Sequence, residues 1–439
     1  MKNRYRTTVL ALGEHRGQPR IYMEGRWLID AGFAPGSSYV IRYDPARIEI
    51  TLAEDGRSVS GKRNGAHAVI DLNCSSLRDC LGAIERVTVQ ADAGSITITA
   101  TRIDARRAQR ELLPTAVSLF AGGGLLSEAV RQAGFDVMAS VEINTKYADI
   151  YQSNYGGRMY NCSVEQVPWE QLTRLAPIGL LEMGIPCEPF TAIRRLDRGG
   201  QQKRPRNLAP EAHELGDMVY WALKAADVLN PHTVIMEEVP KFLESGAGFI
   251  LRLALNRMGY HVEARIINPL EYGALTGRNR AVIVATTFDT VDWPEPSPGK
   301  GRRIGEILDD IPAASELWFN RKTKPWLYDH WQRQSERGNG FEPPKLTADN
   351  PSCPTIKKRY FAGQGDNPVV QHPDPRMRDH HRWLTLDEVR RLMGLPEDYD
   401  LGTAKTTAGE VLGQGVHVET FARLVASVTR TGKEAGHGR

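Results

Sequence analysis

Residues that could carry out chemistry occur in four short stretches of this sequence. The first, Phe120-Ala-Gly-Gly-Gly124, lies between an apolar run and a stretch with helical spacing. Glycines at such a turn let the backbone approach a ligand, and the following helix N-terminus favours electronegative groups. Glu142 ends the next apolar run, where a carboxylate can accept hydrogen bonds from both ribose hydroxyls of a nucleoside. These residues predict a nucleoside site, although a tight turn and a solvated carboxylate would give the same pattern.

The second stretch, Gly184-Ile-Pro-Cys-Glu-Pro-Phe-Thr191, contains a cysteine between two prolines and follows a buried apolar run. The prolines stiffen the loop and hold the thiol of Cys187 at the carboxyl end of a strand, where ligand sites of α/β proteins lie. A free cysteine is more often an inert buried side chain. The loop context favours a nucleophile.

The third and fourth stretches supply charged side chains at strand ends. Glu237 and Glu238 end the apolar run in Ile235-Met-Glu-Glu-Val-Pro240. Arg278 and Arg280 occupy alternate positions before another apolar run, so they point to one side of a strand. Such a pair suits a phosphate, a carboxylate or a pyrimidine carbonyl, and the alternative is a solvated pair.

Alternating strand and helix patterns position these stretches in one α/β domain. Apolar runs alternate with helical spacing, which predicts a doubly wound, mostly parallel sheet with helices on both faces. Residues 288–381 break this rhythm with Pro, Gly, Trp and charge, and helical spacing returns at 386–393 and 420–428. We therefore expect a catalytic domain of residues 112–287 and 382–439 with an inserted domain at 288–381. The expected strands are 116–120, 137–141, 178–183, 234–236 and 281–285.

Residues 1–110 form a separate β-rich module by their period-2 alternation. Shifting this segment by 48 residues aligns Ile48 with Ile96 and Ile50 with Ile98, which predicts two degenerate copies of one strand-rich unit. Residues 102–111 are polar and compatible with a helix, so they read as a connector.

Composition excludes several classes of protein and leaves the partner open. The 439 residues carry 56 Lys+Arg and 53 Asp+Glu, a formal net charge of +3. No run approaches about 18 apolar residues, so a membrane span is not expected. The five cysteines are scattered without a C-x-x-C pair, which disfavours a disulfide framework or structural zinc and fits a reducing cytoplasm. No metal site is expected.

Taken together, the motifs resemble the DNA (cytosine-5) methyltransferase family over residues 114–430. Their order along the chain matches that family, which implies a Rossmann-like methyltransferase fold with residues 288–381 as its target-recognition domain. The residues that carry the resemblance are Phe120-Ala-Gly-Gly-Gly124, Glu142, Pro186-Cys187, Glu237-Glu-Val239, Thr276-Gly-Arg-Asn-Arg280, Arg382 to Pro396 and Gly413-Gln-Gly-Val416.

The resemblance implies a reaction and assigns roles to the residues. The thiolate of Cys187 adds to carbon 6 of cytosine, Glu237 contacts ring nitrogen 3 and the exocyclic amine, and Arg278 contacts the base carbonyl. Arg280 supports Arg278, and the cytosine must flip out of the duplex to be reached. The implied cofactor is S-adenosylmethionine, bound by Phe120, Ala121, Gly122, Gly124, Glu142, Ile143, Ser163, Pro186 and Gln414.

The same resemblance implies double-stranded DNA as partner, a restriction-modification or defence setting, and a cognate restriction endonuclease as a candidate second partner. A tRNA cytosine-5 methyltransferase of the same fold is the nearest alternative. A DNA-binding regulator with a vestigial methyltransferase fold is the other, and the joint presence of Cys187, Glu237 and Arg278 argues against it.

Several positions depart from the family pattern. Glu238 replaces the usual Asn, and Thr276 and Glu188 replace Gln. Ser163 is the residue available where an Asp normally binds the adenine amine, and Gln414 replaces Asn. We expect activity to be retained, with altered support for the catalytic loop or altered cofactor recognition.

Two further segments suggest contacts with nucleic acid. Basic clusters at residues 321–324 and 357–360 have aromatic neighbours, suited to phosphates and base edges, although a solvated charged surface would look the same. Residues 25–36 and the runs after them resemble SymE-type toxins of the AbrB-like swapped-hairpin class. This resemblance suggests that residues 1–110 are a DNA-binding accessory or autoregulatory domain, or else a packing or dimerisation module.

Overall fold

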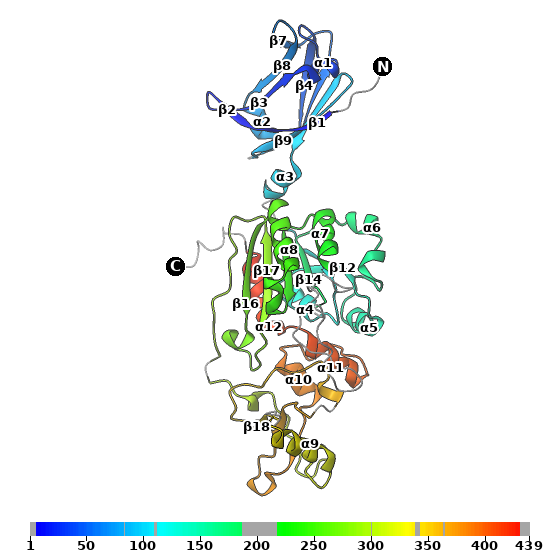
Figure 1. Ribbon diagram of the computed structural model, residues 1–439, viewed down its shortest axis with the longest axis vertical. Coiled ribbons are helices and arrows are strands. Elements are labelled where there is room, and N and C mark those ends of the chain that lie inside the picture. The colour runs from blue at the N-terminus through cyan, green and yellow to red at the C-terminus, as the bar shows by residue number, and fades with distance from the viewer. Residues whose placement is uncertain are drawn as a thin grey trace. The chain divides into compact units, whose positions relative to one another are not determined.

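The computed structural model describes residues 6–82, 84–108, 112–186, 217–299, 301–338, 343–362 and 365–430. The chain divides into two compact units (Figure 1). The first comprises Met1–Glu111 together with Arg257–Tyr260, and the second comprises Leu112–Asn256 and His261–Arg439. Cys187 and Glu188 lie outside the described residues.

Two antiparallel sheets build the N-terminal unit around one apolar core. Buried residues alternate with less buried ones along Gln18–Gly25, Arg86–Asp92 and Ser95–Ala100, as the period-2 pattern requires. Short helices α1 (Arg26–Asp30) and α2 (Ser76–Leu81) connect strands, and α3 (Arg102–Ala108) follows the last strand. The six-stranded sheet has the order β1 (Arg6–Ala11), β9 (Arg86–Asp92), β10 (Ser95–Ala100), β5 (Arg47–Leu52), β4 (Ser38–Asp44), β6 (Arg57–Ser58), and the four-stranded sheet has the order β2 (Gly13–His15), β3 (Gln18–Gly25), β8 (His67–Asn73), β7 (Ser60–Lys62).

The 48-residue spacing is visible in how these strands pair. The order β3, α1, β4, β5 recurs as β8, α2, β9, β10. In the antiparallel pair of β5 and β10, Glu49 lies opposite Thr97, exactly 48 residues on, so the pair is symmetric about this position. Strand β1 pairs with β9 of the second copy, while β6 pairs with β4 of the first. The two segments predicted as copies therefore pair with each other and share one core, and their origin as a repeat stays a prediction.

A seven-stranded sheet forms the centre of the second unit. Its first five strands are parallel, and β17 runs antiparallel to both β15 and β16. The prediction of an α/β fold with a parallel sheet is confirmed, and the apolar runs predicted as strands are strands. The order is β13 (Arg158–Tyr160), β12 (Asp136–Val141), β11 (Thr115–Leu119), β14 (Leu180–Gly184), β15 (Thr233–Glu238), β17 (Arg280–Thr286), β16 (His261–Ile267).

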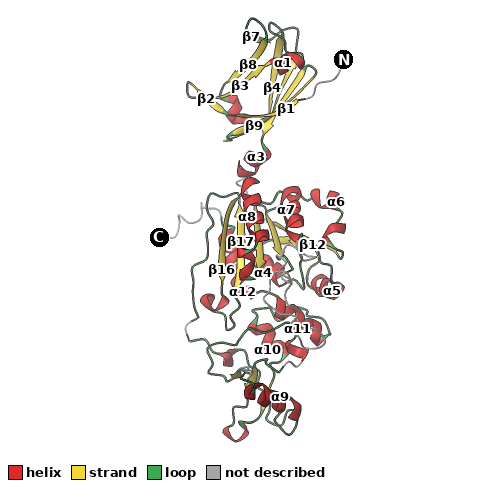
Figure 2. Ribbon diagram, in the orientation of Figure 1, coloured by secondary structure: helices red, strands yellow, loops and turns green. Residues whose placement is uncertain are grey.

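Helices cover this sheet in front and behind (Figure 2). Helix α4 packs closely on α12, whereas α7 contacts β14. Strand β14 is buried along most of its length because helices cover it, and this accounts for its continuous apolar run. The helices of this unit that concern the site or the sheet are α4 (Leu125–Gln132), α5 (Thr145–Asn154), α6 (Trp169–Thr173), α7 (Met218–Leu229), α8 (Gly246–Arg257), α10 (Leu386–Leu392), α11 (Lys405–Gln414) and α12 (Val418–Val428).

The segment after β17 is mostly irregular, as its composition indicates. It contains α9 (Pro325–Glu336) and a small sheet of β18 (Lys345–Leu346), β19 (Val369–Gln371) and β20 (His381–Arg382). Strand β20 crosses the predicted boundary at residue 381. The segment shares one compact unit with the seven-stranded sheet, and its separation as a recognition domain stays a prediction.

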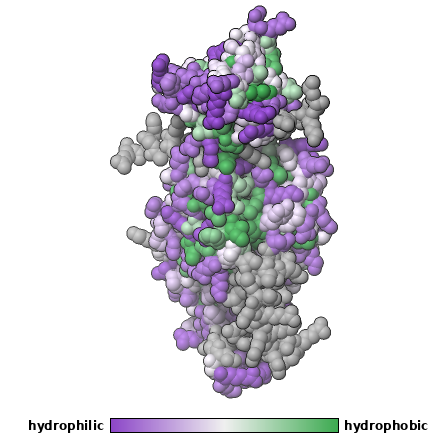
Figure 3. Space-filling view, turned by 45° about the horizontal axis from the view of Figure 1, so that its top comes forward, coloured by the Kyte–Doolittle hydropathy of each residue, from purple (hydrophilic) through white to green (hydrophobic). Residues whose placement is uncertain are grey.

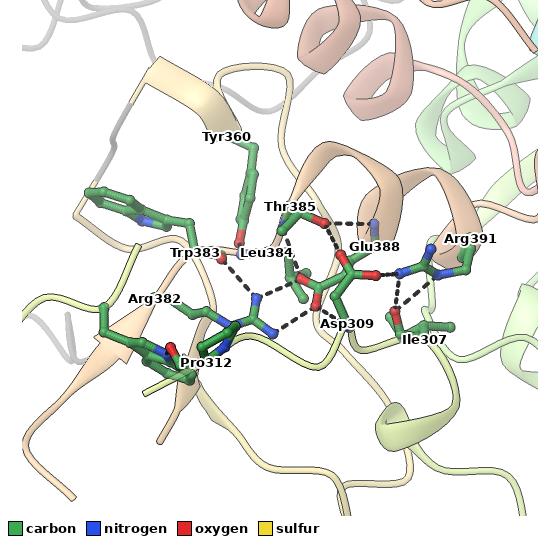
Figure 4. Close-up of polar contacts among 11 residues, drawn as sticks. Ile307, Asp309, Pro312, Tyr360, Arg382, Trp383, Leu384, Thr385, Glu388 and Arg391 are labelled. Carbon is green, nitrogen blue, oxygen red and sulfur yellow. Dashed lines mark hydrogen bonds and ion pairs between the residues drawn. The ribbon is translucent and has the colours of Figure 1, made fainter. Parts of the chain in front are cut away.

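A buried ion pair ties this segment to α10 (Figure 4). The Arg382 guanidinium donates two hydrogen bonds of 2.7 Å to the two carboxylate oxygens of Glu388, and both side chains are fully buried. Thr385 caps α10 and donates to Asp309, while Arg391 donates to the carbonyl of Ile307 at 2.8 Å. These contacts join residues near 307–309 to the helix that precedes α11.

In the view of Figure 3 polar residues cover much of the described surface, and apolar residues gather most clearly near its middle. Helix α8 exposes Phe249, Ile250 and Leu253 to solvent. Among the described helices, none is long and apolar enough to cross a membrane. The described residues also include no cluster of His, Cys, Asp or Glu that could hold a metal ion.

Candidate active site

A cavity of about 320 Å³ lies at the carboxyl end of the parallel strands. It is where an α/β sheet is expected to bind ligands, because loops from neighbouring strands converge there. The segments that line it follow β11, β12, β14 and β15, precede β17, and end α11. The predicted site residues at its wall are Phe120, Ala121, Gly122, Gly124, Glu142, Ile143, Ser163, Pro186, Glu237, Arg278, Arg280 and Gln414. Cys187 follows Pro186 and lies outside the described residues.

The glycine turn after β11 is held in a strained, tightly enclosed conformation. Phe120 has φ = 56° and Gly124 has φ = 90°, both in the left-handed region that favours glycine. A Cβ at Gly123 would lie 2.4 Å from Val411 of α11, and one at Gly124 would lie 2.6 Å from the ring of Tyr155. Glycine is therefore required for close packing at both positions.

Two tyrosines that the sequence did not indicate donate hydrogen bonds to backbone carbonyls of this turn. The Tyr155 hydroxyl donates to the carbonyl of Gly124 at 2.9 Å, and the Tyr399 hydroxyl donates to the carbonyl of Gly123. Burial raises the pKa of both phenols well above the ordinary value. Both are therefore neutral donors at physiological pH.

Glu142 closes the turn from the neighbouring strand. One carboxylate oxygen accepts the backbone N–H of Gly122 at 2.7 Å, and the other accepts that of Asn144 at 2.8 Å. Burial raises the pKa of Glu142, while these backbone donors oppose the shift. Each oxygen keeps a second lone pair, so the carboxylate is fixed in position and can still accept hydrogen bonds from a diol.

The segment after β13 adds to the cavity wall an acidic residue that the sequence did not indicate. Glu165 lines the cavity, and its carboxylate accepts a 2.9 Å hydrogen bond from Ser163. Gln414 donates its amide to the Tyr147 hydroxyl at 3.0 Å, and that hydroxyl donates to Glu410 at 2.9 Å. Burial raises the pKa of Tyr147 to about 12. Because Glu165 follows the predicted site residue Ser163 by two positions, its position in the sequence could have indicated it as a further site residue.

Glu237 and Arg280 form an ion pair at the other end of the cavity. The guanidinium Nε of Arg280 contacts the carboxylate of Glu237, and both side chains are largely buried. Strand β14 places Gly184 directly beside Glu237, so the segment that leads to Cys187 starts next to this carboxylate. A Cβ at Gly184 would lie 3.5 Å from Glu237 Oε2, so glycine keeps this oxygen accessible.

Both arginines donate hydrogen bonds to carbonyl groups at the end of α11. Arg278 donates to the carbonyl of Gly413, and Arg280 donates to the carbonyl of Gln414 at 3.1 Å. Both line the cavity on the same side, as their alternation predicts. The direct contact to Glu237 comes from Arg280, the residue that the resemblance assigned to support.

A further carboxyl group lies buried at the cavity wall beside the glycine turn. Glu182 of β14 accepts a hydrogen bond from Ser127 of α4, which in turn accepts one from Tyr151 at 3.0 Å. Burial raises the pKa of Glu182 to about 7. Sequence reasoning missed Glu182 because it lies inside an apolar run, where a charged residue gives no positional signal.

The sheet brings the glycine turn, the Glu142 carboxylate and the Glu237–Arg280 pair to one cavity at the carboxyl end of its parallel strands, the arrangement of a ligand-binding α/β protein. The matching family specifies that class. The chain belongs to the C-5 cytosine-specific DNA methylase family, whose model matches residues 115–430. The expected DNA cytosine-5 methyltransferase activity is thereby confirmed, and residues 1–114 lie outside the match.

Two distant relatives are each matched over most of their length. The Type II methyltransferase M1.HphI of Haemophilus parahaemolyticus is 23% identical over 325 residues, covering 69% of this chain and 83% of the relative. The tRNA (cytosine(38)-C(5))-methyltransferase of Schizosaccharomyces pombe is 22% identical, covering 71% and 95%. The crystal structure of S. pombe Dnmt2 methyltransferase superposes with a TM-score of 0.56 at 20% identity, covering 72% and 98%, which shows the shared fold.

Proposed function

We propose that this protein transfers a methyl group from S-adenosylmethionine to carbon 5 of a flipped-out cytosine in double-stranded DNA. The observation that carries the proposal is a single cavity that joins the Glu142 carboxylate and glycine turn to the Glu237–Arg280 pair. The first end suits a nucleoside cofactor, and the second suits a polar base. Cofactor and base would therefore meet inside one enclosed site.

The residues present fit S-adenosylmethionine. Glu142 has two fixed oxygens for the ribose hydroxyls, and the turn at Gly122 lets a ligand approach the backbone. Ile143 is exposed beside the cavity and offers an apolar surface to an adenine ring. Ser163 and Glu165 are the polar groups available to the adenine amine in place of the absent Asp. When bound, the sulfonium of this cofactor supplies an electrophilic methyl group.

The protein's own residues would prepare the base for attack. The Cys187 thiolate adds to carbon 6, because carbon 5 of cytosine is a poor nucleophile until an enamine-like adduct forms. Glu237, held by Arg280, accepts a hydrogen bond from the exocyclic amine and lies against ring nitrogen 3, where it stabilises the charge that develops on the ring. Arg278 contacts the base carbonyl. Once carbon 5 carries the methyl group, water or hydroxide removes the carbon 5 proton, and the carbon 5–carbon 6 double bond re-forms as the Cys187 thiolate leaves carbon 6.

The basic clusters of the segment after β17 are our candidates for DNA contact. Lys322, Lys358 and Arg359 are exposed and available to phosphates. Lys324 lies over the rings of Phe319 and Trp383 instead, at 5.7 and 5.2 Å, so it is already engaged. We propose that the residues near 321–326 and 357–361 recognise the target, with Trp326 exposed beside them.

Methyl transfer measured on duplex DNA and on tRNA separates the two nucleic-acid substrates. We expect tritiated methyl transfer to DNA by the wild type and none by Cys187→Ser. Transfer to tRNA alone would favour the S. pombe-like tRNA activity, and transfer to neither would favour a vestigial fold. Bisulfite sequencing of DNA from cells that express the protein would identify the target sequence.

We also propose a restriction-modification or defence setting, with a cognate restriction endonuclease as partner and the cytoplasm as location. The Type II methyltransferase relatives support this setting. For the N-terminal unit we propose an accessory DNA-binding or autoregulatory role, based on its resemblance to swapped-hairpin modules. Gel-shift affinity for duplex DNA should be lower for residues 112–439 than for the full chain at low salt. Equal affinity would indicate a packing module.

A further inference from the structure

Glu238 is a buried carboxyl group next to Glu237 with an unsatisfied oxygen. It ends β15 opposite Ala281 of β17, and 2% of the residue is exposed. One oxygen accepts the backbone N–H of Val239. The other is buried, and no group within the described ranges donates a hydrogen bond to it or accepts one from it. Glu238 lines the same cavity as Glu237 and Arg280, and among the described contacts the guanidinium of Arg280 forms its ion pair with Glu237.

A carboxylate in this position is unfavourable, because burying a charge without a cation or a full set of donors carries a large penalty. A neutral carboxylic acid avoids most of that penalty and still accepts the Val239 N–H. We propose that Glu238 is a positioning residue that works as a neutral acid, and that its ionisation displaces Glu237 and stops methyl transfer. This inference rests on the proposed function for its catalytic part.

The charged surroundings of Glu238 favour the neutral form. Burial and the negative charge of Glu237 raise the pKa of Glu238, whereas the Val239 N–H and, more weakly, Arg280 lower it, and together they bring it to about 8. Lys241 and Glu244 of the following 3-10 helix, Pro240–Glu244, are both exposed to solvent. Strand β14 pairs Gly184 with Glu237, the residue next to Glu238.

Ionisation of Glu238 should therefore be visible as an alkaline limb. Above about pH 8 a second carboxylate would form beside Glu237, which already uses Arg280. We expect the single-turnover rate of methyl transfer to fall about tenfold per pH unit beyond that point. Glu238→Gln cannot ionise, so its rate should not show this limb. Glu244→Gln, which removes an exposed carboxylate nearby, should keep the wild-type profile.

A stability measurement tests the protonation state without any catalytic assay. The raised pKa means that the wild type loses stability as pH rises from about 4.5 to 8. The Tm of Glu238→Gln minus that of the wild type should increase over this range and level off above it. A constant difference, or one that decreases with pH, would show that Glu238 is ionised in the fold and overturn the proposal.

The activity assay and the Tm measurement test the proposed function and the role of Glu238 independently. If neither DNA nor tRNA is methylated, the proposed function falls, while the Tm difference still reports the protonation of Glu238. If Glu238→Gln methylates DNA with the same alkaline limb as the wild type, the positioning role is refuted although the methyltransferase function stands.

Discussion

Arg280 links the two elements that meet at the reacting end of the cavity. Its guanidinium contacts the Glu237 carboxylate of β15 and the Gln414 carbonyl at the end of α11. A planar guanidinium can make both contacts at once, whereas an ammonium group is a single point charge. The ion pair is largely buried, so water cannot replace either contact.

Arg280→Lys should therefore slow methyl transfer while leaving cofactor binding close to normal. We expect a decrease of about 10- to 100-fold in the single-turnover rate, corresponding to about 1.4–2.7 kcal/mol of lost transition-state stabilisation. Calorimetry should show a change in S-adenosylmethionine affinity of less than about threefold. Arg265→Lys is the control, since Arg265 lies over the ring of Trp293 outside the cavity. A large loss of affinity with an unchanged rate would contradict this assignment.

Glu182 predicts a pH-dependent stability of its own. Its pKa of about 7 in the fold exceeds its ordinary value of 4.5 because the group is buried. The folded state binds the proton more tightly than the unfolded chain, so stability is lost as pH rises from about 4.5 to 7. The loss amounts to about 3 kcal/mol at most.

Thermal unfolding of Glu182→Gln checks this expectation. The Tm of the variant should exceed that of the wild type by more at pH 8 than at pH 5. Glu419→Gln removes an exposed carboxylate from α12 and should show no such trend. An advantage that is the same at both pH values would mean that Glu182 is not the titrating group.

At the scale of elements, the turn after β11 requires glycine at position 123 because a neighbouring helix packs closely against it. A Cβ at Gly123 would collide with Val411, whereas one at Gly122 has nothing within 4 Å and meets only the strain of φ = 56°. Gly123→Ala should lower the free energy of unfolding by about 1–3 kcal/mol through overpacking. Gly122→Ala should lower it by about 1 kcal/mol. Urea unfolding without cofactor measures both, and the reverse order would contradict the packing argument.

Helix α10 offers a matched pair of acidic residues for a second test. Glu388 is completely buried against Arg382, whereas the Asp387–Arg390 pair lies at the surface with the Asp387 side chain 59% exposed. Glu388→Gln leaves a buried guanidinium without its counter-charge and should cost about 3–5 kcal/mol. Asp387→Asn should change stability by less than about 1 kcal/mol. Equal effects in denaturant titrations would show that the buried pair does not anchor α10.

Local sequence patterns predicted the elements of the catalytic unit better than the contacts between them. Glu142, Glu237 and Arg280 could be placed because each stands next to an apolar run, and strand ends of a parallel sheet converge. Tyr155 and Tyr399 could not, since Tyr399 reaches Gly123 from 276 positions away. Glu182 was hidden by its apolar neighbours. Contacts between distant segments depend on packing, which the sequence does not state locally.

At the scale of the whole molecule, the spacing of 48 residues predicted two related copies, and the pairing of β5 with β10 follows it symmetrically. The spacing could not show that β1 pairs with β9 of the second copy and β6 with β4 of the first, because β4 and β9 occupy equivalent positions in the two copies. That pairing makes each copy incomplete without the other. Ile50 and Ile98, one from each copy, are fully buried in the same core.

The N-terminal unit should therefore unfold as one cooperative block, separate from the catalytic unit. Ile50→Ala and Ile98→Ala should each destabilise the same calorimetric transition by about 2–4 kcal/mol, because both enlarge one shared core. S-adenosylhomocysteine at 100 times its dissociation constant should stabilise only the other transition, by about 2.7 kcal/mol. Hydrogen exchange should show the amides of β4 and β5 losing protection together with those of β9 and β10 in either variant. Loss of protection confined to the mutated copy would show that the copies fold independently, and a ligand shift of both transitions would show that the two units unfold together.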